Sequence, residues 1–154
     1  MAHVVMINGV VVAMSDIPQP GLPGAAELTN DDPRVLAFLA PATASATLAT
    51  KIAAGITITS AATPALNATY ALDSVTLTQI QAVAQDSAAG MGLPGNAATF
   101  SYPDIKGQQH TFTASQLIAV YRAMRDLLWV LNTQGASLAH GTPAKWPVQT
   151  AVIA

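Results

Sequence analysis

The sequence predicts an α+β protein, in which an N-terminal β-hairpin arm precedes a compact domain of short antiparallel strands packed on two to four helices. Three observations predict this class. A two-residue turn signal joins two β-rich runs at the start of the chain, alternating strand pairs occur twice further on, and each pair precedes a segment with helical periodicity. The 154 residues fit one domain, or one domain with an arm.

The hairpin is the clearest local signal. Residues 4–7 and 10–14 are β-rich runs on either side of Asn8 and Gly9, the dipeptide that best tolerates the positive φ angles of a type I′ turn. A lone two-stranded hairpin is marginally stable in water, so residues 1–16 must pack on their own domain or on another chain. The apolar candidates for that contact are Val4, Val5, Met6, Ile7, Val10, Val11 and Val12.

Residues 17–28 begin with three prolines and two glycines, which predicts a linker. A helix then starts at Asp32 and Pro33, because an aspartate caps free amides and proline suits the first helical position. Pro41 is expected to end that helix. Residues 42–54 form a second, alanine-rich helix, closed by Gly55.

The compact domain is expected over residues 29–135. Residues 56–59 and 70–72 predict a strand and its return strand. Thr76 opens a capping box for a helix that stops at Gly90, and Asp73 is expected to help the first turn of that helix.

The second strand pair has Phe100 and Tyr102 on one side and His110 and Phe112 on the other, which predicts a hairpin. Thr113 opens another capping box and the longest helix, over residues 114–133 with Gly135 closing it. Residues 136–154 form a tail that could end in one more strand.

Composition limits the function classes. Charged residues make up 9% of the chain, against about 25% in a typical domain. This indicates either a surface covered by neighbours or an Ala/Thr/Ser-rich composition. The net charge is −2 and the basic residues are scattered, so nucleic-acid binding is not expected. No run of about 18 residues is continuously apolar, so no membrane span is expected, and no signal peptide is apparent. Disulfides are excluded because the chain has no cysteine.

No catalytic, metal or cofactor site is expected. His3 lies at the start of the chain and His140 in a Gly/Ser/Thr-rich segment. His110 lies in a strand, where a structural histidine is favoured over a base. No serine or threonine stands in a nucleophile motif, and no phosphate-binding loop or zinc motif is present.

Aromatic side chains leave two alternatives open. Phe100, Tyr102 and Phe112 could stack on a glycan, although a core between the hairpin and the long helix is favoured. Trp129 and Trp146 could anchor an interface or pack together.

Several motifs that occur in order over residues 54–131 closely resemble an uncharacterised domain that recurs in bacteriophage and prophage tail proteins. They are Gly55-Ile-Thr-Ile-Thr-Ser, Thr63-Pro-Ala-Leu-Asn-Ala-Thr-Tyr-Ala-Leu-Asp, Gly92-Leu-Pro-Gly, Phe100-x-Tyr-Pro-Asp and His110-Thr-Phe-Thr. The N-terminal Ile-x-Asn-Gly-x-Val-Val hairpin and the Asp-Asp-Pro-x-Val-x-Ala-Phe-Leu segment give a layout similar to that of tail-fibre-associated and tail-fibre-assembly proteins.

The resemblance implies a phage tail protein without catalytic residues, made in the bacterial host cytoplasm. The first interpretation of the chain is a structural component of the tail at the fibre or baseplate, which attaches to other tail proteins through the N-terminal hairpin. The alternatives are a tail-fibre assembly chaperone and a module that binds a host receptor or glycan. Self-association into a homo-oligomer is left open.

Overall fold

The computed structural model describes residues 1–154, and it has the expected α+β class. The chain forms two compact units. Unit 1 comprises residues 1–47 and 135–144, and unit 2 comprises residues 48–134 and 145–154. These groupings differ from the expected boundaries, because the division falls inside one long helix and near the end of another.

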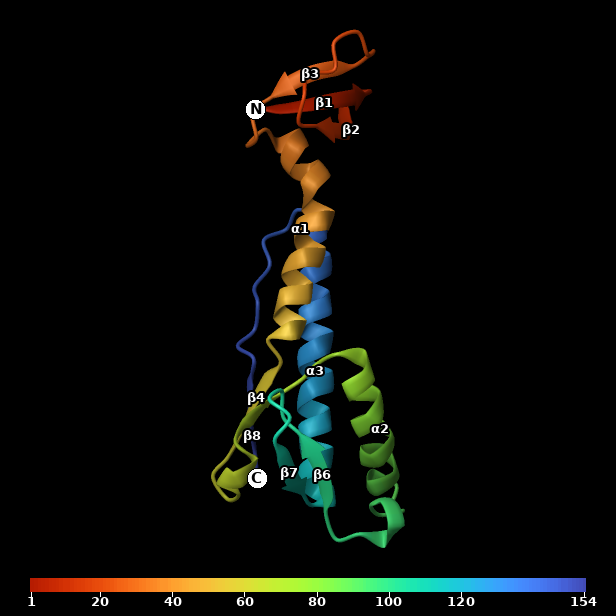
Figure 1. Ribbon diagram of the computed structural model, residues 1–154, viewed down its shortest axis with the longest axis vertical. Coiled ribbons are helices and arrows are strands. Elements are labelled where there is room, and N and C mark those ends of the chain that lie inside the picture. The colour runs from red at the N-terminus through yellow and green to blue at the C-terminus, as the bar shows by residue number, and fades with distance from the viewer. The chain divides into compact units, whose positions relative to one another are not determined.

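Unit 1 contains a three-stranded antiparallel sheet in the order β2-β1-β3 (Figure 1). Strands β1 (Ala2–Ile7) and β2 (Val10–Ser15) form the expected hairpin, and its turn residues have φ angles of 51° at Asn8 and 79° at Gly9. The positive φ angles agree with the turn type that the Asn-Gly pair predicts.

The predicted linker is wrong at its C-terminal end, where residues 25–28 form strand β3 (Ala25–Leu28) against β1. The Pro/Gly segment turns the chain back, and the Met6 amide donates to the Gly24 carbonyl at 2.9 Å. A strand at this position satisfies backbone groups on the second edge of β1, which a hairpin alone would leave unpaired. The composition of the segment predicted the turn but not the return strand.

Helix α1 (Pro33–Ala53) is continuous, so the expected break at Pro41 is wrong. Asp32 caps its start through the Arg34 amide at 2.9 Å, and Gly55 (φ 72°) follows its end, both as expected. Proline removes one helical hydrogen bond, but the alanine-rich sequence on both sides of Pro41 strongly favours the helix.

Unit 2 contains a mixed sheet in the order β5-β4-β8 and a separate hairpin. Strand β4 (Ile56–Ser60) pairs antiparallel with β5 (Ala68–Tyr70) and parallel with β8 (Thr150–Ile153). Strands β6 (Phe100–Pro103) and β7 (Gln109–Phe112) form the second expected hairpin. The last strand therefore pairs within the chain, which the sequence left open.

Helix α2 (Ser74–Ala88) starts one turn earlier than its capping box suggested. Asp73 is the residue that caps it, since its carboxylate accepts hydrogen bonds from the Val75 and Thr76 amides, both at 3.0 Å. The expected box at Thr113 does open α3, where the Thr113 amide donates to Gln116 Oε1 at 3.0 Å.

Helix α3 (Ala114–Ala139) does not end at Gly135, which is a helical, buried residue. It ends instead at Gly141, which has a φ angle of 77°. The Thr142 amide donates to the Ser137 carbonyl and the Gly141 amide to the Leu138 carbonyl, the two bonds of a Schellman cap. The correct glycine lies six residues beyond the expected one.

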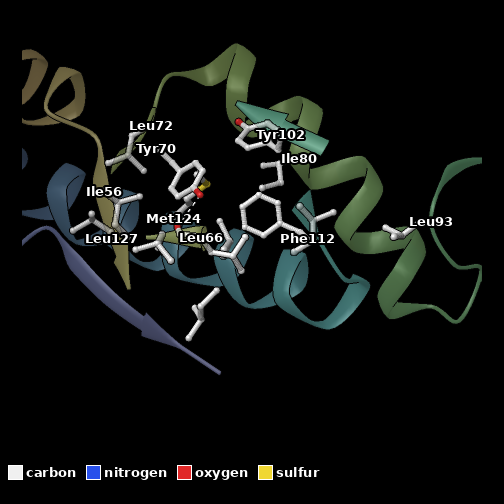
Figure 2. Packing of buried hydrophobic residues seen from close by; sticks show 14 of the residues in the cluster. Ile56, Leu66, Tyr70, Leu72, Ile80, Leu93, Tyr102, Phe112, Met124 and Leu127 are labelled. Atoms are coloured by element: carbon white, nitrogen blue, oxygen red, sulfur yellow. Dashed lines mark hydrogen bonds between the residues drawn. The ribbon is translucent and has the colours of Figure 1, made fainter. Parts of the chain in front are cut away.

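The core of unit 2 joins both helices to the strands (Figure 2). Tyr70 and Phe112 are fully buried with ring centroids 5.7 Å apart, and Met124 of α3 lies beside them. Fifteen buried hydrophobic residues form this cluster, whereas the buried cluster of unit 1 has four, namely Ala2, Val4, Val11 and Val35.

Candidate functional site

The seven hairpin residues that the sequence marked as contacts divide into two groups. Val4 and Val11 are buried in the small core of unit 1, and Val5 and Met6 are half-buried. The other three face solvent: Ile7 is 60% exposed, Val10 is 63% exposed and Val12 is 46% exposed. The hairpin therefore belongs partly to its own core, and it also keeps an apolar surface free.

A groove beside β2 continues this apolar surface within unit 1. It has a volume of about 500 Å³. The hairpin lines one side through Gly9 of the turn and through Val10 and Val11 of β2. The other side is a stripe of α1 at helical spacing, formed by Arg34, Ala37, Phe38 and Pro41.

Sequence reasoning did not predict the helical side of this groove, because Pro41 indicated a helix end. A helix that continues through Pro41 instead extends the apolar stripe by one turn. Proline has no N–H group, so the Ala37 carbonyl in the groove wall lacks its helical donor. Leu36 and Leu39, on the same helix, are 53% and 37% exposed.

The charge at the groove is neutralised locally. Arg34 donates to both carboxylate oxygens of Asp32, from Nε at 2.9 Å and from Nη2 at 2.7 Å. The hydrogen bond from the Arg34 side chain, followed by that from its amide, lowers the pKa of Asp32 to about 2. The pair is thus charged and internally balanced over the whole physiological pH range, and the groove presents no net charge.

The three aromatic residues offered for glycan stacking lie in the core of unit 2. Tyr102 and Phe112 are buried, and Phe100 packs against the same cluster. Figure 2 shows Tyr102 and Phe112 among the other core side chains. A stacking platform needs exposed ring faces, so these residues do not form one and the alternative that favoured a core is correct.

The two tryptophans have different environments. Trp146 is half-buried and packs against the unit 2 core, whereas Trp129 is 70% exposed on α3. Trp129 thus remains an interface candidate, and Trp146 serves the packing of its own unit.

His110 is buried in unit 2 and touches three elements. Its Nδ1 lies 2.7 Å from the Ala65 carbonyl oxygen, its Nε2 lies 3.3 Å from Asp104 Oδ2, and its ring meets Tyr70 edge-on. Asp104 Oδ1 accepts from the Lys106 and Gln108 amides at 2.8 and 2.9 Å. Both ring nitrogens of His110 therefore face acceptor oxygens, one of a main-chain carbonyl and one of a carboxylate.

The pKa of Asp104 reflects opposing effects. Burial disfavours the charged carboxylate, but hydrogen bonds from the Gln108 amide, the His110 ring and the Lys106 amide outweigh burial and hold the pKa below its usual value. Sequence reasoning did not predict the contact between Asp104 and His110.

A hollow of about 690 Å³ in unit 2 is bordered by Asp104, Lys106 and His110, together with Thr57 and Thr69. The two threonine hydroxyls bond to each other at 3.0 Å. Both nitrogens of His110 are occupied, by a main-chain carbonyl and a carboxylate, so this histidine does not activate a hydroxyl here. No group of three or more histidine, aspartate or glutamate side chains could hold a metal ion.

One helix, α1, is long and apolar enough to cross a membrane when judged by length and composition, with a mean hydropathy of 1.4 over 18 residues. The expectation of no span was based on the absence of an uninterrupted apolar run. The mean hydropathy of α1 is high nevertheless, because it averages the threonines of the helix with its many alanines and leucines. Length and composition alone are weak evidence for a span.

Comparisons with known proteins leave the family of the chain undetermined. A scan against protein-family models, a search of curated proteins and a search of solved structures each find no match.

Proposed function

We propose that this chain is a non-catalytic structural subunit that attaches to neighbouring proteins through the apolar surface of unit 1. The observation that carries the proposal is the exposure of Ile7, Val10 and Val12 beside a neutral apolar groove. Scattered apolar residues are normal on a protein surface, but a contiguous apolar strand and groove favour a partner.

The proposed setting is a bacteriophage tail, at the fibre or baseplate, with assembly starting in the host cytoplasm. The support for this setting is the resemblance of residues 54–131 and of the N-terminal hairpin to tail proteins. The proposed partners are other tail proteins, and neither nucleic acid nor a membrane is among them. The scattered basic residues support the first exclusion.

The environment of the buried histidine, His110, supports a non-catalytic role. Both ring nitrogens of His110 have acceptor partners, which leaves no free base beside a hydroxyl nucleophile.

The test is mass spectrometry of purified particles made with the natural chain or with Val12→Lys. The control variant is Val152→Lys, because Val152 is 81% exposed on the unit 2 strand β8. We expect the natural and control chains to be present in the particles and Val12→Lys to be strongly depleted, since a buried lysine at the interface costs binding.

Equal incorporation of both variants would exclude unit 1 as the attachment surface. Absence of the natural chain from finished particles, together with its capture on unassembled fibres, would replace the structural role with that of an assembly chaperone.

A further inference from the structure

The turn of the N-terminal hairpin contains the one asparagine of the chain that precedes a glycine. The chain has five asparagines, and only Asn8 is followed by a residue without a side chain. Asparagine is a labile residue in proteins, because the main-chain nitrogen of the next residue can attack its side-chain carbonyl carbon. A side chain on that next residue hinders the attack, and glycine has none. The hairpin turn therefore combines a reactive residue with its least hindered neighbour.

Both reacting groups in this turn are free. Asn8 and Gly9 are exposed, and the side chain of Asn8 forms no hydrogen bond with the protein. The Gly9 amide has no acceptor within the protein. The space where a Cβ atom of residue 9 would lie is open. The main-chain nitrogen of Gly9 is therefore accessible to base and is not held by a hydrogen bond.

Asn96 has the same local conformation and provides a contrast within the chain. Its φ angle is 56°, close to the 51° of Asn8, and it is also exposed. The next residue, Ala97, has a side chain, and its amide donates to the Pro94 carbonyl at 3.3 Å. Exposure and a positive φ angle are thus common to Asn8 and Asn96, whereas the free nitrogen of an unhindered neighbour is found at Asn8.

The other three asparagines are less suited to the reaction. Asn67 Oδ1 accepts from the Ser60 amide at 2.6 Å, and Asn132 Nδ2 donates to a carbonyl of its own helix at 2.9 Å. These hydrogen bonds hold the side chains in place. Asn30 precedes Asp31, whose side chain hinders the attack. Asn8 is therefore the favoured site among the five.

We propose that Asn8 deamidates spontaneously in the folded chain and thereby gives the neutral attachment surface a negative charge as the protein ages. Base first removes the proton of the Gly9 amide, whose nitrogen forms a bond to Cγ of Asn8 while the Cγ–Nδ2 bond breaks. The side-chain nitrogen takes a proton from water and leaves as ammonia, and a cyclic imide remains. Water then opens the imide, so the whole reaction converts a carboxamide and water into a carboxylate and ammonium.

The imide opens in two ways, and the products differ in the main chain. Attack of water at Cγ gives aspartate with a normal main chain, and an Asp-Gly pair also suits a type I′ turn. Attack at the main-chain carbonyl carbon gives isoaspartate, in which the main chain runs through Cβ and Cγ of residue 8. This longer main chain does not fit the turn that sets Ile7 opposite Val10.

The new carboxylate lies at the edge of the apolar groove. Gly9, the next residue in the chain, lines the groove, and Asp32 already neutralises Arg34, the charged residue of the lining. The added charge is therefore unbalanced, and covering it with an apolar partner costs free energy. This effect on attachment rests on the proposed function of unit 1, whereas the deamidation itself does not.

The first test follows the full natural chain by peptide mass spectrometry during storage at mildly alkaline pH. We expect Asn8 to lose its amide, with aspartate and isoaspartate as products, and an acidic species to appear on anion exchange at the same rate. Asn96 is the internal control, and we expect it to keep its amide over the period in which most of Asn8 is converted. Equal rates at Asn8 and Asn96, or no loss at Asn8, would overturn the proposal.

Two variants separate the charge from the chemistry. Asn8→Gly has no amide to lose, and Asn8→Asp has the charge of the product; Gly-Gly and Asp-Gly both suit a type I′ turn, so the hairpin persists. We expect no acidic species from stored Asn8→Gly, and less Asn8→Asp than Asn8→Gly in purified particles. An acidic species that forms from Asn8→Gly at the natural rate would overturn the assignment of the site. Equal incorporation of the two variants would overturn the effect on attachment.

These outcomes can be distinguished from a failure of the proposed function. If Val12→Lys is incorporated as well as Val152→Lys, the attachment role of unit 1 fails, whatever happens at Asn8. If Val12→Lys is depleted while Asn8→Asp is incorporated like Asn8→Gly, the attachment role remains and the effect of the charge is refuted.

Discussion

Unit 1 and unit 2 use apolar residues in different ways. Unit 2 buries fifteen hydrophobic side chains in one cluster that joins two helices to four strands and the end of the chain. The buried cluster of unit 1 has four, and other apolar side chains of the unit are exposed along β2 and α1. A large core stabilises a fold by itself, whereas a small core beside exposed apolar groups gains stability when a partner covers them. The contrast supports the proposed attachment role of unit 1, and it predicts that the stability of unit 2 depends on its own core.

The largest expected effect tests the self-sufficiency of unit 2. Phe112→Ala removes a fully buried ring that contacts Tyr70, and we expect a loss of about 3–5 kcal/mol in the free energy of unfolding. Chemical denaturation measures this loss. Val152→Ala is the matched control at an exposed site of the same unit, and we expect a change within about 0.5 kcal/mol. Similar losses for both variants would mean that the cluster does not determine stability.

The next largest effect on stability is expected when one of two glycines is replaced by alanine. Gly55 and Gly90 have φ angles of 72° and 81°, so alanine is strained by about 1–2 kcal/mol at either position. A Cβ atom at Gly55 would also collide with the Tyr70 carbonyl oxygen, whereas the space around Gly90 is open. We expect Gly55→Ala to lower the thermal midpoint clearly more than Gly90→Ala. Equal shifts would contradict the close approach of α1's end to β5.

Acid should act on unit 2 through Asp104. Because the pKa of this carboxyl is lowered in the folded protein, its contribution to stability is complete above the usual aspartate pKa of about 4. That contribution is lost as the pH falls through the lowered folded value. We expect the urea midpoint to fall between pH 7 and pH 3, and to fall less in Asp104→Asn. If Asp104→Asn kept the full pH dependence of the natural chain, the Asp104 carboxylate would not contribute to the acid sensitivity of unit 2.

The smallest expected effect on stability belongs to Trp129. Its side chain is 70% exposed on α3, so Trp129→Ala should change the unfolding free energy by no more than about 0.5 kcal/mol. The amount of the Trp129→Ala variant in purified particles then shows whether unit 2 takes part in attachment. Unchanged incorporation restricts attachment to unit 1, and a strong loss adds unit 2 to the attachment surface.

Local signals predicted most of the elements. The Asn8-Gly9 turn, the Asp32 cap, the Thr113 capping box and the two strand pairs are properties of short segments, and all of them appear in the structure. Helix ends were harder to predict, because Pro41 and Gly135 are breakers by propensity alone. At Pro41 the alanine-rich flanks favour the helix, and at Gly135 the helix continues because the residue is buried by tertiary packing. Both effects outweigh the local preference of the residue.

The features that sequence reasoning missed depend on contacts between distant residues. Strand β3 exists because β1 offers a second edge, and the parallel pairing of β8 with β4 joins residues about ninety positions apart. The groove needs both β2 and the part of α1 that follows Pro33. The contact of His110 with Asp104 is the local exception, since the two residues lie six positions apart across the β6–β7 turn, and sequence reasoning missed it as well.

Amide hydrogen exchange of β2 and β4 tests the central contrast most directly. In a dilute sample of the monomeric chain, we predict slow exchange in β4, which lies between two strands, and fast exchange at the β2 amides that point away from β1. Covering β2 by a partner should slow its exchange, without a change in β4. Equally slow exchange of both strands in the monomer would contradict the account, because unit 1 would then need no partner.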